Sequence, residues 1–213
     1  MKKYLWIFTL IYLVSCSNHN SEIIPLDISA LMPDTSDGLT INESREHSER
    51  IYTMMIENTV NRKIPEIYVY DTLNQPVKLK SMLDNKNIII SADAYCGFGK
   101  ESMMKDFPEA IEKYRTQHSD IDLNVICLAK ESPEDKQNPD QFSDFVDDLK
   151  SKYSNLYIIK NEEAHKLNLH ANPVRLYVNE DFVVKHFDVG LSLVEGNLYN
   201  EIETNLYHLS NNK

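Results

Sequence analysis

Apolar positions follow two patterns along the chain, and together they predict a sheet between layers of helices. Continuous apolar and β-branched runs at 87–92 and 121–129 are typical of strands buried on both faces, and a shorter run follows at 156–159. Helical spacing of apolar residues predicts helices over 99–117 and after Pro139. Strands that alternate with helices indicate an α/β fold with a central mixed β-sheet flanked by helices on both faces.

Two hairpins and two further helices complete the expected domain. The hairpins join strands at 67–70 and 77–79, and at 174–178 and 182–187. A short helix is expected over 162–169, and Leu198, Ile202, Leu206 and Leu209 form one face of a last helix. Pro108 lies inside the 99–117 helix and is expected to kink it.

The first residues have the features of an export signal. Lys2 and Lys3 precede an apolar stretch, 5–14, that is too short to span a membrane as a mature helix. It ends in Leu13-Val14-Ser15-Cys16, which resembles the bacterial lipoprotein box, in which the Cys is lipidated and becomes the N-terminus. The alternative is an ordinary secretory peptide that ends in a Cys by chance. We expect a signal peptide over 1–16 and lipidation of Cys16. The protein would then be membrane-anchored in the bacterial cell envelope, with its domain facing the periplasm; the choice between inner and outer membrane stays open.

Residues 17–62 are expected to tether the domain. Residues 17–40 are polar, lack a clear period and contain Pro25, Pro33 and Gly38. Apolar residues along one side of 42–62 indicate a short helix there. The folded domain is expected over 63–213.

Charge and cysteine content exclude several functions. The net charge is −11, and no Lys/Arg cluster interrupts the acidic surface, so nucleic-acid binding is excluded. With Cys16 lipidated, Cys96 and Cys127 are too few for a disulfide-stapled fold, and Cys127, in the middle of a strand, is expected in the core. His165 and His170 lack further converging ligands, so we expect no metal and no cofactor.

The candidate chemistry lies at Cys96-Gly97-Phe98-Gly99, where a buried strand leads into a helix. A Cys at a helix start faces unpaired backbone N–H groups and the positive end of the helix dipole, which both favour the reactive thiolate. Lys100 in the first turn would add to this effect.

Three segments in order carry a family resemblance. Residues 64–67 with 75–79 resemble an opening hairpin, Ala94-Tyr95-Cys96-Gly97-Phe98-Gly99-Lys100 is similar to a Trp-Cys-Gly-Pro-Cys-Arg/Lys box, and 164–178 resembles a run into a cis-proline, followed by Val189-Gly190. Over 63–209 the chain resembles the thioredoxin-like superfamily, in particular its exported thiol:disulfide-interchange (redoxin) branch. The resemblance implies a thioredoxin-like fold, Cys96 as the attacking thiol and a cis bond before Pro173. It also implies that Asn172 can hydrogen-bond the sulfur. The substrate would bind at Tyr95, Gly97, Phe98, Asn172 and Pro173.

Two departures from the family pattern limit which thiol–disulfide reaction the site can carry out. Gly99 replaces the second Cys, and Ile90 stands where many thioredoxins bury a proton-moving Asp, so the two-cysteine cycle cannot run within one site. We expect single-cysteine thiol–disulfide chemistry with an exported thiol- or disulfide-containing protein or peptide. The alternative is a redox-inactive domain that binds a peptide or protein partner in the groove beside Pro173. A one-cysteine peroxidase ranks last, because Ile89 and Asp93 replace the Pro and Thr of the peroxiredoxin motif.

Two charged residues occupy strand positions that are usually small or apolar. Because a lone buried charge is costly, Asp93 and Arg175 are expected to pair near Cys96, where Arg175 would favour the thiolate. The alternative is that each is exposed at a strand end.

Overall fold

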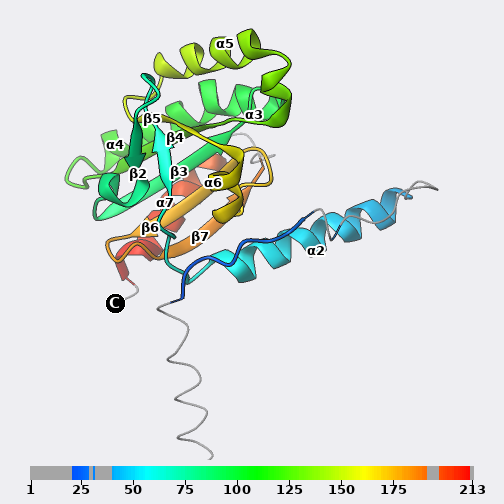
Figure 1. Cartoon of the computed structure of the whole chain (residues 1–213). Coiled ribbons are helices and arrows are strands. Elements are labelled where there is room, and N and C mark those ends of the chain that lie inside the picture. Colours follow the sequence, from blue (N-terminus) through cyan, green and yellow to red (C-terminus); the bar gives the residue numbers. More distant parts are fainter. Residues whose placement is uncertain (1–20, 29–30, 32–39, 191–196, 212–213) are drawn as a thin grey trace, which may run out of the picture.

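The computed structural model describes residues 21–28, 31, 40–190 and 197–211 (Figure 1). The predicted signal peptide and Cys16 lie outside these residues. A seven-stranded sheet has the order β2-β1-β5-β4-β3-β6-β7, with β3, β4 and β5 parallel and the outer strands antiparallel. The strands are β1 (Tyr68–Tyr70), β2 (Pro76–Lys78), β3 (Lys86–Ala92), β4 (Asn124–Lys130), β5 (Leu156–Ile159), β6 (Val174–Asn179) and β7 (Val184–Val189). The predicted mixed sheet and both hairpins are confirmed.

Helices cover both faces of this sheet, as predicted. The helices are α2 (Ile41–Thr59), α3 (Gly97–Glu101), α4 (Phe107–Gln117), α5 (Pro139–Lys150), α6 (Asn161–Lys166) and α7 (Asn197–Asn211). One core forms between the sheet and α4, α5 and α7, and the other lies beneath α2 and α6. Along β3, Ile88 and Ile90 belong to the first core and Ile89 to the second, which is why this strand is apolar throughout.

The helix predicted over 99–117 is one continuous helical segment with an irregular turn. Between α3 and α4, residues Ser102–Asp106 form a π turn, in which the Phe107 N–H donates to the Ser102 carbonyl five residues earlier. Pro108 has no N–H and cannot complete a regular helical ladder. The helical segment is therefore irregular directly before Pro108, as a π turn, and the kink expected at Pro108 stays a prediction.

Part of the predicted tether belongs to the folded domain. Residues 21–28, which we call the strap, lie against the start of the domain: the Lys63 N–H donates to the Ser21 carbonyl (2.9 Å) and the Ile23 N–H to the Lys63 carbonyl (3.0 Å). Ile23 and Leu26 are buried in the core beneath α2 and α6. The ordered structure thus begins well before residue 63, and the predicted helix over 42–62 is α2.

Helix α2 runs out from the domain (Figure 1). Thr40 and Glu43 cap its start through reciprocal hydrogen bonds, and its buried residues, Met55 and Thr59, lie near its end. None of the helices in the described ranges is long and apolar enough to cross a membrane.

Candidate active site at the carboxyl end of β3

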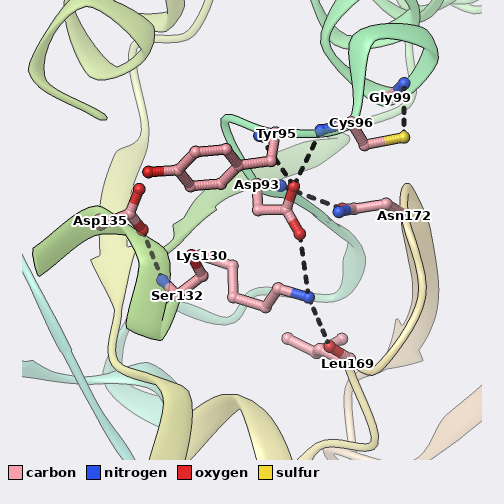
Figure 2. A network of polar contacts seen from close by, with 9 residues as sticks. All are labelled: Asp93, Tyr95, Cys96, Gly99, Lys130, Ser132, Asp135, Leu169 and Asn172. Carbon is pink, nitrogen blue, oxygen red and sulfur yellow. Dashed lines mark hydrogen bonds and ion pairs between the residues drawn. The ribbon is translucent and has the colours of Figure 1, made fainter. Parts of the chain in front are cut away.

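Cys96 lies between the carboxyl end of β3 and the first turn of α3. Its side chain is half-buried, and its sulfur accepts a hydrogen bond from the Gly99 N–H at 3.4 Å (Figure 2). The Lys100 N–H donates to the Cys96 carbonyl at 2.8 Å, which continues the helix from this residue. A backbone N–H of the first turn therefore points at the sulfur, as the sequence predicts, and such a donor favours a negatively charged sulfur.

Asp93 fixes the loop that carries Cys96. Its Oδ1 accepts hydrogen bonds from the Tyr95 and Cys96 N–H groups, both at 3.1 Å, in an Asx-type turn. Its other oxygen, Oδ2, lies 3.5 Å from the ammonium of Lys130. One carboxylate thus orders the backbone before the helix and also binds a cation behind it (Figure 2).

Lys130 is a site residue that the sequence analysis missed. It is the last residue of β4, only 8% exposed, and its Nζ also donates to the Leu169 carbonyl at 3.1 Å. The predicted strand stopped at residue 129, so the lysine was left outside it. A lysine at the end of a buried strand needs a carboxylate nearby, and this requirement could have pointed to Asp93.

The predicted Asp93–Arg175 pair is wrong. Arg175, 3% exposed, lies 3.6 Å from Asp188 of β7 and 3.6 Å from Glu201 of α7. It projects with Tyr177 toward the core beneath α7, whereas Lys130 and Leu169, which surround the Asp93 carboxylate, lie on the α6 side. The register also opposes Arg175 to Ile90, three residues and about 10 Å before Asp93. The thiolate-stabilising role inferred for Arg175 through this pair is withdrawn.

The loop before β6 lies against the Cys96 loop. The Asn172–Pro173 peptide bond is cis, as the resemblance implies. The Asn172 Oδ1 accepts a hydrogen bond from the Asp93 N–H at 3.0 Å. We predicted that the Asn172 side chain would hydrogen-bond the Cys96 sulfur, and the structure shows it bonded to the Asp93 backbone instead. The Gly190 N–H donates to the Pro173 carbonyl at 2.8 Å from a backbone with φ of +84°, which favours glycine.

Gly99 leaves the frame of a two-cysteine site intact. A Cβ placed on Gly99 would lie 3.4 Å from both the Cβ and the Sγ of Cys96, and 3.6 Å from the Cβ of Asn172. The Cβ atoms of a disulfide lie about 3.5–4.5 Å apart. The backbone could therefore carry a second thiol opposite Cys96, although this chain has none there.

The remaining predicted site residues differ in their surroundings. Tyr95 is 37% exposed, and its ring reaches toward Asp135 (Figure 2); partial burial and the Asp135 charge raise the pKa of its phenol. A Cβ on Gly97 would meet no atom within 4 Å, so this position is open. The Lys100 ammonium lies 2.7 Å from Asp148 of α5, and its effect on the thiolate stays a prediction. The side chain of Phe98 lies outside the described part of the structure.

Cys127 lies in the core, as predicted. It is fully buried in β4, opposite Ile90 of β3, and burial raises the pKa of its thiol well above the usual value. The rings of His165 and His170 meet edge to face at 4.9 Å. Within the described ranges, no group of three or more His, Cys, Asp or Glu side chains is arranged to hold a metal ion.

Comparison with known proteins identifies the fold. No protein-family model matches the chain, and no curated protein does. A structure from Aquifex aeolicus, described as an electron transfer protein, matches with a TM-score of 0.53 and 18% identity over 73% of this chain and 100% of that one. The fold is thioredoxin-like. A structure from Bacteroides thetaiotaomicron, described as a protein disulfide isomerase, matches this thioredoxin-like chain with a TM-score of 0.50 and 14% identity, over 70% of this chain and 90% of that one. At these identities the likeness establishes the fold alone.

Proposed function

We propose that this thioredoxin-like protein is exported, anchored by a lipid on Cys16, and exchanges thiols and disulfides through Cys96 alone. The observation that carries the proposal is the setting of the Cys96 sulfur, which is half-buried and accepts the Gly99 N–H at 3.4 Å. The loop with the cis Asn172–Pro173 bond lies beside it. A sulfur that can be reached and is bonded by a backbone donor suits nucleophilic attack.

The exchange needs a second molecule at each step. The Cys96 thiolate attacks one sulfur of a substrate disulfide, forming a mixed disulfide, and the other sulfur leaves as a thiolate that takes a proton from solvent. Because Gly99 has no thiol, a thiol from another exported protein or a small molecule attacks the mixed disulfide and restores Cys96. The protein is unchanged at the end, and the disulfide has passed from one thiol partner to another.

The reaction can be measured with a single-thiol form of the chain from Ser17 onward. Cys127→Ala leaves Cys96 as the one thiol, and mixing with bis(2-hydroxyethyl) disulfide should give a mixed disulfide detectable by mass spectrometry. We expect the folded protein to react at least about tenfold faster than the same chain in urea, because only the folded site presents the Gly99 N–H. Cys96→Ser, with Cys127 present, should not react.

Equal rates in the folded and unfolded chain would overturn the proposal. The groove beside Pro173 would then be tested as a peptide-binding site without redox chemistry.

The lipid anchor is supported by the basic residues, apolar stretch and Leu-Val-Ser-Cys box at the N-terminus. Expression of the full chain in a bacterium should place it in the membrane fraction and label it with a fatty acid. Cys16→Ser should abolish the label and release the protein, whereas Ser17→Ala should do neither.

A further inference from the structure

A cavity of about 420 Å³ opens between the end of α4 and α7. Its volume lies in the range of pockets that bind small organic molecules. It lies at the far end of the helical segment that begins beside Cys96, so roughly 30 Å of helix separate it from the thiol (Figure 1). Three rings, two aliphatic side chains and a carboxylate line it: Tyr114, His118, Tyr207, Ile121, Leu206 and Glu203.

The rings that line the cavity come from both helices. Tyr114 and His118 of the α4 end stack with their ring centres 4.5 Å apart and 29° between their planes. Tyr114 is 3% exposed and therefore fixed by the core, whereas Tyr207 of α7 is 66% exposed. Ring faces pack against other rings and attract cations through their π-electrons. The cavity is therefore suited to an aromatic body and to a positive charge.

Glu203 supplies a negative charge to this cavity. Its Oε1 accepts a hydrogen bond from the Tyr199 hydroxyl at 2.7 Å and lies 3.0 Å from the Nε2 of His118, and among the described residues no hydrogen bond goes to its Oε2. The bonds from Tyr199 and His118 lower the pKa of Glu203, so the carboxylate is ionised at neutral pH. Burial, with the charges of Glu203 and Asp120, raises the pKa of the Tyr114 phenol, so the negative field reaches the rings.

No cation of the described chain is paired with Glu203. Within the described ranges, no lysine or arginine nitrogen lies within 4 Å of its carboxylate. A neutral imidazole can donate one N–H, so the contact with His118 needs no positive charge. Lys113 lies over the ring of Tyr199, 4.0 Å from its centre, and does not line the cavity. The cavity thus offers an ionised oxygen that a cationic ligand can occupy.

We propose that this cavity binds a small organic cation, an ammonium group carried on an aromatic body. The ammonium donates to Oε2 of Glu203, and the aromatic body packs against the rings of Tyr114, His118 and Tyr207. The carboxylate repels an anion of the same shape, and a neutral molecule of that shape lacks the ion pair. Binding involves no covalent step and is independent of the exchange proposed at Cys96.

A series of small ligands tests the proposal on the parent chain from Ser17, labelled with ¹⁵N and followed by amide NMR. For 2-phenylethylammonium we expect saturable shifts at His118, Ile121 and Tyr207, with a dissociation constant below about 1 mM. The neutral 2-phenylethanol should bind about tenfold more weakly, and the anion 3-phenylpropanoate more weakly still. 1-Butylammonium, which resembles a lysine side chain and lacks the ring, should also bind about tenfold more weakly.

Substitutions assign the charge recognition to the cavity. Glu203→Gln keeps an oxygen that can accept from Tyr199 and His118, and should weaken binding of 2-phenylethylammonium about tenfold while leaving 2-phenylethanol unaffected. Tyr207→Leu changes an exposed side chain, removes the ring and should weaken binding about threefold. The matched control is Glu162→Gln, an exposed carboxylate of α6 on the other face of the sheet, which should leave binding unchanged.

The ligand series decides the proposal even where a variant fails to fold, because it uses the parent chain alone. Equal dissociation constants for 2-phenylethylammonium and either 2-phenylethanol or 1-butylammonium overturn it, as do shifts confined to other parts of the protein. Unchanged binding in Glu203→Gln, with the parent's urea midpoint, overturns it as well. Cys96→Ser should bind the ammonium as the parent does, so failure of the exchange function leaves this site standing.

Discussion

Gly99 faces Cys96 across the first turn of α3, and its backbone would place a Cβ 3.4 Å from the Cys96 Cβ. A shift of a few tenths of an ångström reaches the usual disulfide separation. We therefore expect the thiol introduced by Gly99→Cys to form a disulfide with Cys96 under mild oxidation. With both thiols reduced, the variant should also be able to reduce the disulfide of a substrate protein, an activity that a single thiol cannot complete without a second thiol. Alkylation with mass spectrometry would count the free thiols. Glu101→Cys, exposed at the end of α3, serves as the control; two free thiols at these positions in oxidised Gly99→Cys would contradict the prediction.

Asp93 combines two roles that substitutions can separate. Asp93→Ala removes the acceptor for the Tyr95 and Cys96 N–H groups, whereas Asp93→Asn can keep that acceptor and loses only the charge facing Lys130. We expect Asp93→Ala to slow the reaction of Cys96 with a small disulfide more than Asp93→Asn does, because only the former frees the loop. Similar slowing in both variants would show that the loop does not depend on this acceptor.

The charge of Asp93 is expected to affect mainly stability. Asp93→Asn leaves the buried Lys130 ammonium without its carboxylate, which should cost on the order of 2 kcal/mol of unfolding free energy in urea titration. Adding Lys130→Met to Asp93→Asn removes the unpaired charge and should recover part of the loss. A double variant that is less stable than either single variant would rule out this pairing as the cause.

At the scale of elements, Asn168 connects the strap to the rest of the domain. Its side chain accepts the Leu26 N–H (2.8 Å) and donates to the Ile24 carbonyl (3.0 Å) and to Thr59 (2.9 Å), from a backbone with φ of 56°. Asn168→Gly keeps this conformation and loses the bonds, so we expect a loss of about 2 kcal/mol; Asn168→Ala adds backbone strain and should lose about 3 kcal/mol. Urea unfolding measures both.

A chain that begins at Lys63 provides the matching test of the strap. It lacks the buried side chains of Ile23, Leu26 and Met55, and should be much less stable than the chain from Ser17. If Asn168→Gly and the shortened chain both unfold at the parent's urea concentration, the strap contributes nothing to the fold.

The elements also show how far sequence patterns reach. The apolar runs of β3 and β4 and the two hairpins were predicted, because local composition and spacing determine them, whereas the cis bond before Pro173 was predicted from the family resemblance alone. The strap was not, because it has no period and is held by long-range bonds to residues 63 and 168. The ion-pair partner of Arg175 was not predicted, because it depends on how β6 is aligned between β3 and β7. This register determines the face of the sheet from which the Arg175 side chain projects and places Asp188 beside it, and the sequence of β6 alone does not specify the register.

For the whole molecule, His170 links stability to pH. The pKa of His170 is lowered from 6.5 to about 4, mainly by burial, and the nearby charges of His165 and Lys130 act in the same direction. A hydrogen bond to the Leu26 backbone and the charge of Asp27 act in the opposite direction and raise this pKa, but their effect is smaller. Between pH 6.5 and 4, His170 is therefore protonated in the unfolded chain but stays neutral in the folded protein. Because the unfolded state binds this additional proton, the free energy of unfolding falls as the pH falls through this window. Partial exposure screens the effect to about 1–2 kcal/mol. His170→Gln should flatten this part of the melting-temperature profile, whereas exposed His208→Gln should not; parallel profiles for parent and His170→Gln would exclude the linkage.

The distance between the domain and a membrane follows from where the strap begins. Ser21 is bonded to Lys63, so only residues 17–20 separate the proposed lipidated Cys16 from the folded unit, a reach of about 17 Å when extended. The lipidated protein should therefore hold its domain near the bilayer. Inserting about 20 Gly/Ser residues after Ser17 would add about 25 Å of average span.

Energy transfer from a donor dye on Cys96 to acceptor-labelled lipids measures this distance, since Cys127 is buried and can be replaced by Ala. The inserted segment should lower transfer in vesicles and leave the urea midpoint unchanged, because it precedes the strap. Equal transfer with and without the insertion would mean that something other than the short connection at Cys16, such as direct contact between the domain and the lipid surface, sets the position of the domain.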